Sequence, residues 1–82
     1  MAKVVLTASM AQRFTGGVTE FELDAVDVRG VIRAMEALFP GLGPHLSEGM
    51  AVAIDGEMYQ DAYLERVKPD SEVYFLPRIG GG

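Results

Sequence analysis

Apolar and polar residues alternate along two stretches near the start of the chain, and this predicts two β-strands. In residues 3–8 (KVVLTA) every second side chain is apolar or small, which is the period of a strand that buries one face. Residues 19–23 (TEFEL) place apolar side chains on one face and two glutamates on the other, as in a half-buried strand. Gly16-Gly17 marks a turn, so we expect these strands to form a hairpin.

The period then changes to about 3.6 residues, which predicts one main helix. A single helical stripe is formed by Val28, Val31, Ile32, Met35, Leu38 and Phe39. Asp27 stands where an N-cap is needed, and Pro40-Gly41 is expected to end the helix. Gly30 inside this segment costs about 1 kcal/mol relative to alanine, and nothing in the pattern explains it.

The second half of the chain predicts a loop followed by short strands. Residues 41–49 indicate a loop with room for one helical turn. Residues 50–54 (MAVAI) predict a buried strand, Asp55-Gly56 is a hairpin turn signal, and residues 57–59 predict a brief return strand. Residues 72–76 (EVYFL) predict the last strand, because side chains meant for the core and for the outer side alternate along them. Its core-facing residues are Val73 and Phe75; its outward-facing residues are Glu72, Tyr74 and Leu76.

This order predicts an α+β fold with a mixed four- to five-stranded sheet and one main helix across one face. The pattern by itself is compatible with several small topologies of this class. With 82 residues, the chain has room for one domain. We expect that domain to span residues 1–77 and to be followed by a flexible glycine tail at 78–82.

The composition argues against chemistry carried out by the chain's own side chains. Cysteine is absent and His45 is the single histidine, so neither a Ser-His-Asp triad nor a two-histidine zinc site is complete within the chain. Four carboxylates cluster in the sequence: Asp55, Glu57, Asp61 and Glu65. Their spacing matches no calcium loop, so we expect no bound metal. Because no triad is complete, we also expect no catalytic residue.

Charge and hydropathy narrow the possible partners. Twelve acidic and seven scattered basic residues give a net charge of −5, which argues against nucleic acid and favours a partner with a basic surface. No run of about 20 apolar residues is present, so no membrane span is predicted. The first residues enter a strand pattern directly and lack the layout of a signal peptide, so a cytoplasmic location is expected.

Three glycines, Gly80-Gly81-Gly82, follow the last predicted strand. One interpretation is a frayed terminus or a remnant of cloning. The other is functional: residues without a Cβ atom can enter a channel that bulkier residues would block. Such a tail would deliver the terminal carboxylate into the active site of another protein.

Residues 70–82 (DSEVYFLPRIGGG) resemble the C-terminal signature of the MoaD/ThiS family, in which an acidic turn leads to an apolar strand, a proline and a diglycine. Residues 3–6 (KVVL) and 52–57 (VAIDGE) also stand where family members have similar segments. The family includes the small subunit of molybdopterin synthase and the sulfur carrier of thiamine synthesis. The resemblance therefore implies a β-grasp, ubiquitin-like fold.

The resemblance also implies roles for the tail. Gly82 would be adenylated by an ATP-using, ubiquitin-activating-like enzyme and converted to a thiocarboxylate, with Gly81 as the slim residue behind it. ATP would be used by that enzyme, and no cofactor would be bound by this chain. The implied partner-binding residues are Tyr74, Leu76, Pro77, Arg78, Ile79 and Gly80. Many family members have a larger residue at the position of Gly80, and glycine there raises the cost of ordering the tail by about 0.5–1 kcal/mol.

Several functions remain open at this point. The first is a sulfur carrier for molybdopterin, because residues 75–77 (FLP) and the chain length are closest to that branch. The sulfur would then pass to an enzyme such as the large subunit of molybdopterin synthase. A thiamine or cysteine-type carrier, a ubiquitin-like modifier joined to lysines, and a binding module with an incidental tail are the alternatives. An enzyme is the least favoured class.

Overall fold

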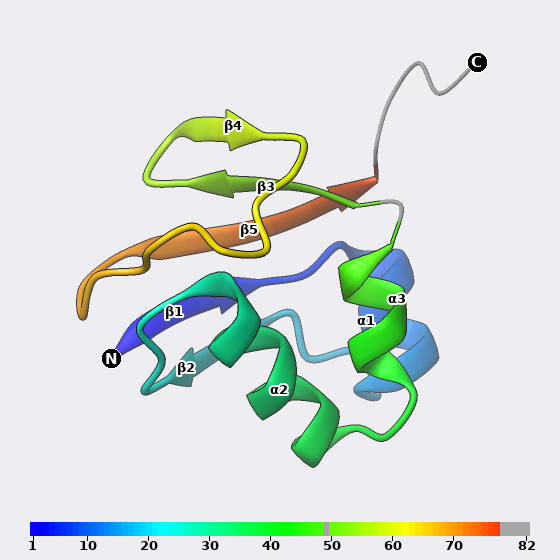
Figure 1. Cartoon of the computed structure of the whole chain (residues 1–82). Coiled ribbons are helices and arrows are strands. Elements are labelled where there is room, and N and C mark those ends of the chain that lie inside the picture. Colours follow the sequence, from blue (N-terminus) through cyan, green and yellow to red (C-terminus); the bar gives the residue numbers. More distant parts are fainter. Residues whose placement is uncertain (49, 78–82) are drawn as a thin grey trace.

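The computed structural model describes residues 1–48 and 50–77. Five strands within these ranges form one sheet: β1 (Ala2–Val5), β2 (Glu20–Leu23), β3 (Met50–Ile54), β4 (Glu57–Tyr59) and β5 (Glu72–Pro77). Three helices accompany them: α1 (Ala8–Phe14), α2 (Val28–Leu38) and α3 (Leu42–Ser47). Figure 1 shows α1 and α3 beside each other at one end of the molecule. The ring centroids of Phe14 in α1 and His45 in α3 lie 5.3 Å apart there.

The strands follow the order β2-β1-β5-β3-β4. β1 and β5 are parallel, and the other neighbouring pairs are antiparallel. The predicted mixed sheet is therefore confirmed, as is the pairing of the first two strands. β5 lies in the middle of the sheet although it comes last in the sequence, so the strand that leads to the tail is held by strands on both sides.

A single apolar core fills the space between the sheet and α2. The largest fully buried side chains in the described part of the chain are Phe75, Met35, Leu42, Val4, Val28, Val31 and Val73. They come from β1, β5, α2 and α3, so the central strands and the helices are joined by one contiguous cluster. The predicted core-facing residues of the last strand, Val73 and Phe75, are thus confirmed, and alternate residues of β1 are buried as its pattern predicts.

Helix α2 begins where the sequence predicts. The Asp27 carboxylate accepts a hydrogen bond from the Gly30 N–H at 2.7 Å, which satisfies one of the free donors of the first turn. Gly30 lies close to the same contact: a Cβ at this position would be 3.1 Å from the capping oxygen, so Asp27 would have to shift slightly to admit a side chain. The predicted stripe is wrong at Leu38, which is 55% exposed.

Helix α1 is absent from the sequence prediction, and the first strand is shorter than the alternation indicates. β1 ends at Val5, and Thr7 caps α1 by accepting a hydrogen bond from the Met10 N–H at 3.2 Å. Met10 and Ala11 are buried on the inner side of this seven-residue helix. A helix this short shows barely two turns of pattern, so its periodicity does not stand out from the alternation that precedes it.

The predicted loop at 41–49 contains a complete short helix, α3. Its start is fixed by Glu36, whose carboxylate accepts hydrogen bonds from the Gly41 N–H at 3.0 Å and the Gly43 N–H at 2.8 Å. Gly43 has no room for a side chain, because a Cβ would come within 2.9 Å of Glu36. Leu42 and Leu46, one turn apart, are buried in the core.

Candidate functional site: the last strand and the open face of the sheet

The last strand presents two kinds of side chain because its residues alternate between the faces of the sheet. Val73 and Phe75 are completely buried against the helices. Tyr74 is 36% exposed, and Leu76 is half-buried on the same outward side. Pro77 is exposed and pairs with Met50 of β3. The predicted orientation of these side chains is therefore correct, and their role in binding a partner stays a prediction.

Three further residues share the outward side, and the sequence pattern does not single them out. Val5 and Ala53 are the register partners of Tyr74 on its two sides, and Met58 is the partner of Ala53. These residues form a row across four strands, and Met58 is 55% exposed. Alternation within each strand indicates which of its side chains face outward. The alignment of these side chains in one row depends on the register between strands, which the sequence does not show. We call Val5, Ala53, Met58, Tyr74 and Leu76 the outer face.

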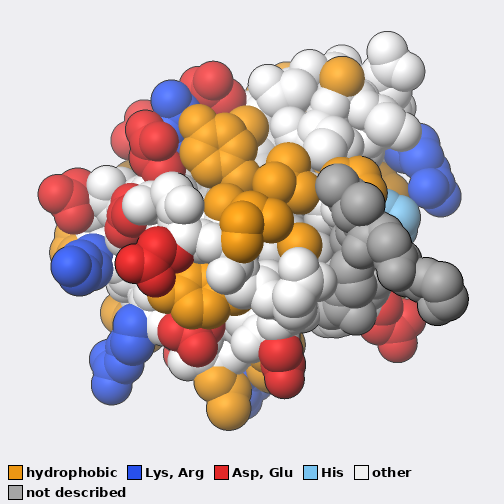
Figure 2. All heavy atoms as spheres, turned by 90° about the horizontal axis from the view of Figure 1, so that it is seen from above, with side chains coloured by type: hydrophobic (Ala, Val, Ile, Leu, Met, Phe, Trp, Pro, Cys, Tyr) orange, Lys and Arg blue, Asp and Glu red, His pale blue; other side chains and the backbone are white. Residues whose placement is uncertain are grey.

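Acidic side chains border the outer face along β2 and at the start of β5. The exposed residues Glu20, Glu22 and Glu72 all point outward, since each alternates with a residue directed to the core. Lys3 lies among them and contacts Glu20 at 3.4 Å. The hydrogen bond and the charge of Glu20 raise the pKa of Lys3 above 10.5. In Figure 2 apolar side chains form a patch in the middle of the face seen there, with acidic side chains along its left-hand side.

A hydrogen-bond network fixes the start of the last strand. The Asp55 carboxylate accepts one bond from the Glu72 N–H at 2.9 Å and another from the Ser71 hydroxyl at 2.8 Å. The Ser71 oxygen in turn accepts a bond from the Lys68 N–H at 2.9 Å. These bonds, first that of the Glu72 N–H and then that of Ser71, hold the pKa of Asp55 below its ordinary 3.8. The β3–β4 turn is thereby tied to the entry of β5.

The residues predicted to carry sulfur lie outside the described residues. This applies to Gly81 and Gly82, and also to the predicted partner-binding residues Arg78, Ile79 and Gly80. The structure therefore places Tyr74, Leu76 and Pro77 at the end of the domain, directly before those five positions.

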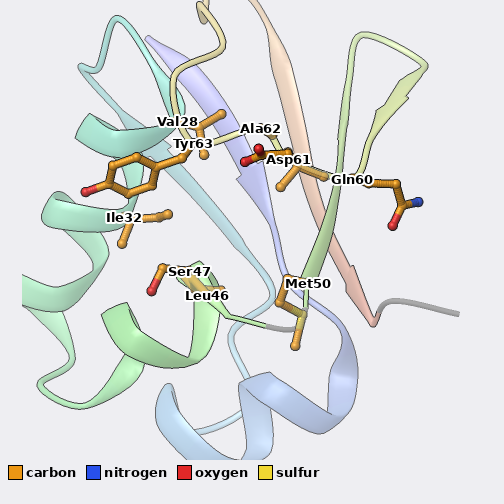
Figure 3. A pocket seen from close by; sticks show the side chains of 10 residues that line it. Val28, Ile32, Leu46, Ser47, Met50, Gln60, Asp61, Ala62 and Tyr63 are labelled. Carbon is orange, nitrogen blue, oxygen red and sulfur yellow. The ribbon is translucent and has the colours of Figure 1, made fainter. Parts of the chain in front are cut away.

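The rest of the described surface has hollows but no cluster of metal-binding side chains. Within 1–48 and 50–77, metal-binding side chains nowhere gather in threes, and Asp55 is occupied by the bonds described above. No helix in these ranges has the length and apolar character needed to cross a membrane. On the helix side of the sheet, a hollow of about 50 Å³ lies between α2, α3, β3 and the segment after β4. Its labelled side chains are shown in Figure 3.

Known structures share this architecture. A chain of the BexX/CysO complex of Amycolatopsis orientalis matches with a TM-score of 0.83 and 20% identity, over 100% of both chains. Mycobacterium tuberculosis CysO matches with a TM-score of 0.83 and 16% identity, over 96% of this chain and 100% of that one. The small archaeal modifier protein SAMP1 of Methanosarcina acetivorans matches with a TM-score of 0.78 and 21% identity, over 99% of this chain and 95% of that one.

These similarities and the strand order define a ubiquitin-like, β-grasp protein, which confirms the predicted fold. The model of the ThiS family matches residues 5–82, so the chain belongs to the ThiS family. This is a family of sulfur carriers and ubiquitin-like modifiers, whose members are small carrier proteins rather than catalysts. None of the curated proteins matches this chain.

Proposed function

We propose that this protein is a sulfur carrier whose Gly82 carboxylate is converted to a thiocarboxylate. The observation that carries the proposal is the family match, which runs from β1 to the diglycine and covers residues 5–82. The arrangement of the last strand supports it, because β5 is the central strand of the sheet. Because β5 is fixed between two strands, a partner that binds the outer face would receive the start of the tail in a defined position.

The proposed chemistry takes place in a partner enzyme that supplies ATP. An oxygen of the Gly82 carboxylate attacks the α-phosphorus of ATP, a new P–O bond forms, and pyrophosphate leaves. A sulfide equivalent then attacks the acyl carbon, a C–S bond replaces the C–O bond to phosphate, and AMP leaves with the electron pair. The protein itself contributes the carboxylate and a slim tail, since Gly81 and Gly80 carry no Cβ that would obstruct a narrow channel.

The outer face is the proposed docking surface for the activating enzyme. Tyr74, Leu76 and Met58 supply apolar contact area, and Glu20, Glu22 and Glu72 supply a negative border. Complementary charge accelerates encounter and sets orientation, so the partner surface is expected to be apolar in the middle and basic at its edge. Pro77, Arg78 and Ile79 extend this contact toward the tail in the proposal.

The proposed recipient of the sulfur is the pathway to molybdopterin, through an enzyme such as the large subunit of molybdopterin synthase. The residues that favour it are Phe75, Leu76 and Pro77, together with the length of the chain. Carriers for thiamine or cysteine-type synthesis use the same tail chemistry. Complementation of bacterial strains that each lack one small sulfur carrier distinguishes these recipients, because growth is restored only in the strain whose pathway accepts this protein.

A second candidate function is a ubiquitin-like modifier joined to lysines. Two structural neighbours, SAMP1 of Methanosarcina acetivorans and SAMP1 of Haloferax volcanii, carry the word modifier or its abbreviation in their names. The chemistry diverges after the adenylate: attack by a lysine amine gives an isopeptide, and attack by a sulfide equivalent gives a thiocarboxylate. The product therefore separates the two functions.

The test is an intact-mass measurement of the protein after incubation with ATP, a sulfur donor and extract of its host. We expect a species heavier by the difference between one sulfur and one oxygen atom, and we expect deletion of Gly82 to abolish it. Tyr74→Ser should slow its formation, whereas Leu38→Ser, on an exposed apolar residue away from the outer face, should not. Absence of the species in the unmodified chain would exclude the carrier function, and conjugates of higher mass would then favour the modifier.

A further inference from the structure

The five methionines of the chain differ sharply in exposure. Met10 and Met35 are buried in the core, and Met50 is half-buried against it. Met58 is 55% exposed, and Met1 at the start of the chain is 69% exposed. Cysteine is absent, so the most accessible sulfur atoms of the described residues are the thioethers of Met58 and Met1.

Met58 lies in the row of paired residues that makes up the outer face, whereas Met1 precedes β1. Its strand, β4, is at the edge of the sheet, with β3 as its neighbour. Met58 is the register partner of Ala53, which is in turn the partner of Tyr74. Neighbouring strands lie about 4.8 Å apart, so the backbones at Met58 and Tyr74 are about 10 Å apart, with the small Ala53 between them.

A sulfoxide at Met58 changes the character of the outer face. The thioether is apolar and unbranched, so it adapts to an opposing surface, whereas a sulfoxide carries a polar oxygen. A partner that covers Tyr74 and Met58 together removes this oxygen from water. Without a hydrogen bond in return, burial of such a polar group is costly, so oxidation of Met58 weakens docking.

Oxidation at this position leaves the fold intact. Met58 and its partner Ala53 alternate with Val52 and Tyr59, which pack on the core side, so the Met58 side chain points away from the core. The thioethers of Met10 and Met35, by contrast, are buried and become accessible only when the protein unfolds. A peroxide therefore reacts with the folded protein at Met58 in preference to these two.

We infer that Met58 is an oxidation site whose state controls docking of the carrier. The inference rests on the proposed function, which assigns the outer face to the activating enzyme. The oxidant is a peroxide: a lone pair of the Met58 sulfur attacks a peroxide oxygen, an S–O bond forms and the O–O bond breaks. Hydroxide leaves with the electron pair and takes the proton of the transferred oxygen, which yields a sulfoxide and water. The oxidised carrier is withheld from activation until a methionine sulfoxide reductase, supplied with a thiol reductant, restores the thioether.

The test compares sulfur loading before and after oxidation. The unloaded carrier is treated with dilute hydrogen peroxide, the peroxide is removed, and loading is followed with ATP, a sulfur donor and desalted extract of the host. An added oxygen and an exchange of oxygen for sulfur change the mass almost equally, so tryptic peptides are measured. Arg66 and Arg78 lie between Met58 and Gly82, which therefore fall in different peptides. Oxidation of Met58 should lower the loading rate at least about fivefold, and sulfoxide reductase with a thiol should restore it.

Three variants assign the effect to Met58. Met58→Leu keeps an apolar side chain without sulfur, so its own loading rate should be the same before and after treatment with peroxide. Met50→Leu is a volume-conserving change that retains Met58, and peroxide should slow its loading as it slows that of the unmodified chain. Met58→Gln places a polar amide in the outer face and should be loaded slowly without any oxidant. Circular dichroism and melting curves establish that each variant is folded.

Two outcomes would overturn the inference. One is an unchanged loading rate after Met58 has been converted to the sulfoxide. The other is equal inhibition of Met58→Leu and the unmodified chain by peroxide, because this would place the sensitive group elsewhere, for example at Met1. In both cases the thiocarboxylate still forms on the untreated chain, so these results are distinct from a failure of the carrier function.

Discussion

At the scale of single residues, side-chain oxygens determine where the elements begin. Thr7, Asp27 and Glu36 each accept hydrogen bonds from free N–H groups at the start of a helix, the positions at which an uncompensated donor is costly. Asp55 has the equivalent role for a strand, since it accepts bonds from the backbone of Glu72 and the hydroxyl of Ser71. It also has a positive φ of 50°, a conformation that asparagine and aspartate tolerate well.

The contribution of Asp55 to stability should depend on pH. Its pKa in the folded protein is lowered from 3.8 by the hydrogen bonds of Glu72 and Ser71. Stabilisation by the carboxylate is therefore present above about pH 3.8 and is lost as the pH falls through the lower pKa of the folded state. Asp55→Asn keeps a residue that tolerates this φ but removes the charge. We expect its free energy of unfolding to be lower than that of the unmodified protein at neutral pH, with the difference disappearing in acid.

Urea unfolding at a series of pH values measures this difference. Asp70→Asn, at an exposed carboxylate with no hydrogen bond to another element in the described residues, is the matched control. A difference between Asp55→Asn and the unmodified chain that stayed constant down to the lowest pH would contradict the network described here.

At the scale of elements, β5 combines the core and the docking surface in one strand. Phe75 is fully buried among residues of β1, β3 and α2, whereas Tyr74 next to it is 36% exposed. The division follows from the two-residue period of a strand. It lets surface residues change without disturbing the core.

Substitution of these two neighbours should therefore have opposite consequences. Phe75→Ala removes a large side chain from the core and is expected to cost about 3–5 kcal/mol, a large share of the stability of a domain of this size. Tyr74→Ala is expected to change the free energy of unfolding by about 1 kcal/mol or less, because the ring is partly solvated, and yet to reduce sulfur loading. Chemical denaturation and the intact-mass measurement check the two expectations. Equal loss of stability in both variants would contradict the assignment of faces.

At the scale of the whole molecule, negative charge is concentrated along one border of the outer face. The net charge is −5, and exposed carboxylates Glu20, Glu22 and Glu72 border the outer face. This negative border orients the outer face toward a basic partner surface and supports the docking proposal.

The rate of activation should consequently depend on salt. Screening weakens attraction between exposed charges over a Debye length of about 10 Å at 0.1 M. We expect kcat/KM of the activating enzyme for this carrier to fall as sodium chloride is added. The triple variant Glu20→Gln, Glu22→Gln, Glu72→Gln should start lower and respond less, whereas Glu48→Gln, away from the outer face, should respond like the unmodified chain. Parallel salt dependence of the triple variant and the unmodified chain would exclude these carboxylates from docking.

The sequence by itself determined the long and strongly patterned features. The stripe beginning at Val28 predicted α2, and alternation in residues 72–76 predicted which side chains of β5 face outward. The C-terminal signature at residues 70–82 indicated the family. These periodic features can be recognised in the sequence because each helix or strand must bury one of its own faces. This requirement sets the spacing of apolar residues within the element, whatever its position in the fold.

The tertiary structure decided what depends on contacts between distant segments. Helices α1 and α3, with seven and six residues, are too short to be stable by themselves, and packing of Met10, Leu42 and Leu46 into a shared core holds them. The row from Val5 to Met58 exists because a parallel pairing places β5 next to β1, and no local pattern encodes that register. The outer face arises in this way, from residues that are neighbours only after the chain has folded.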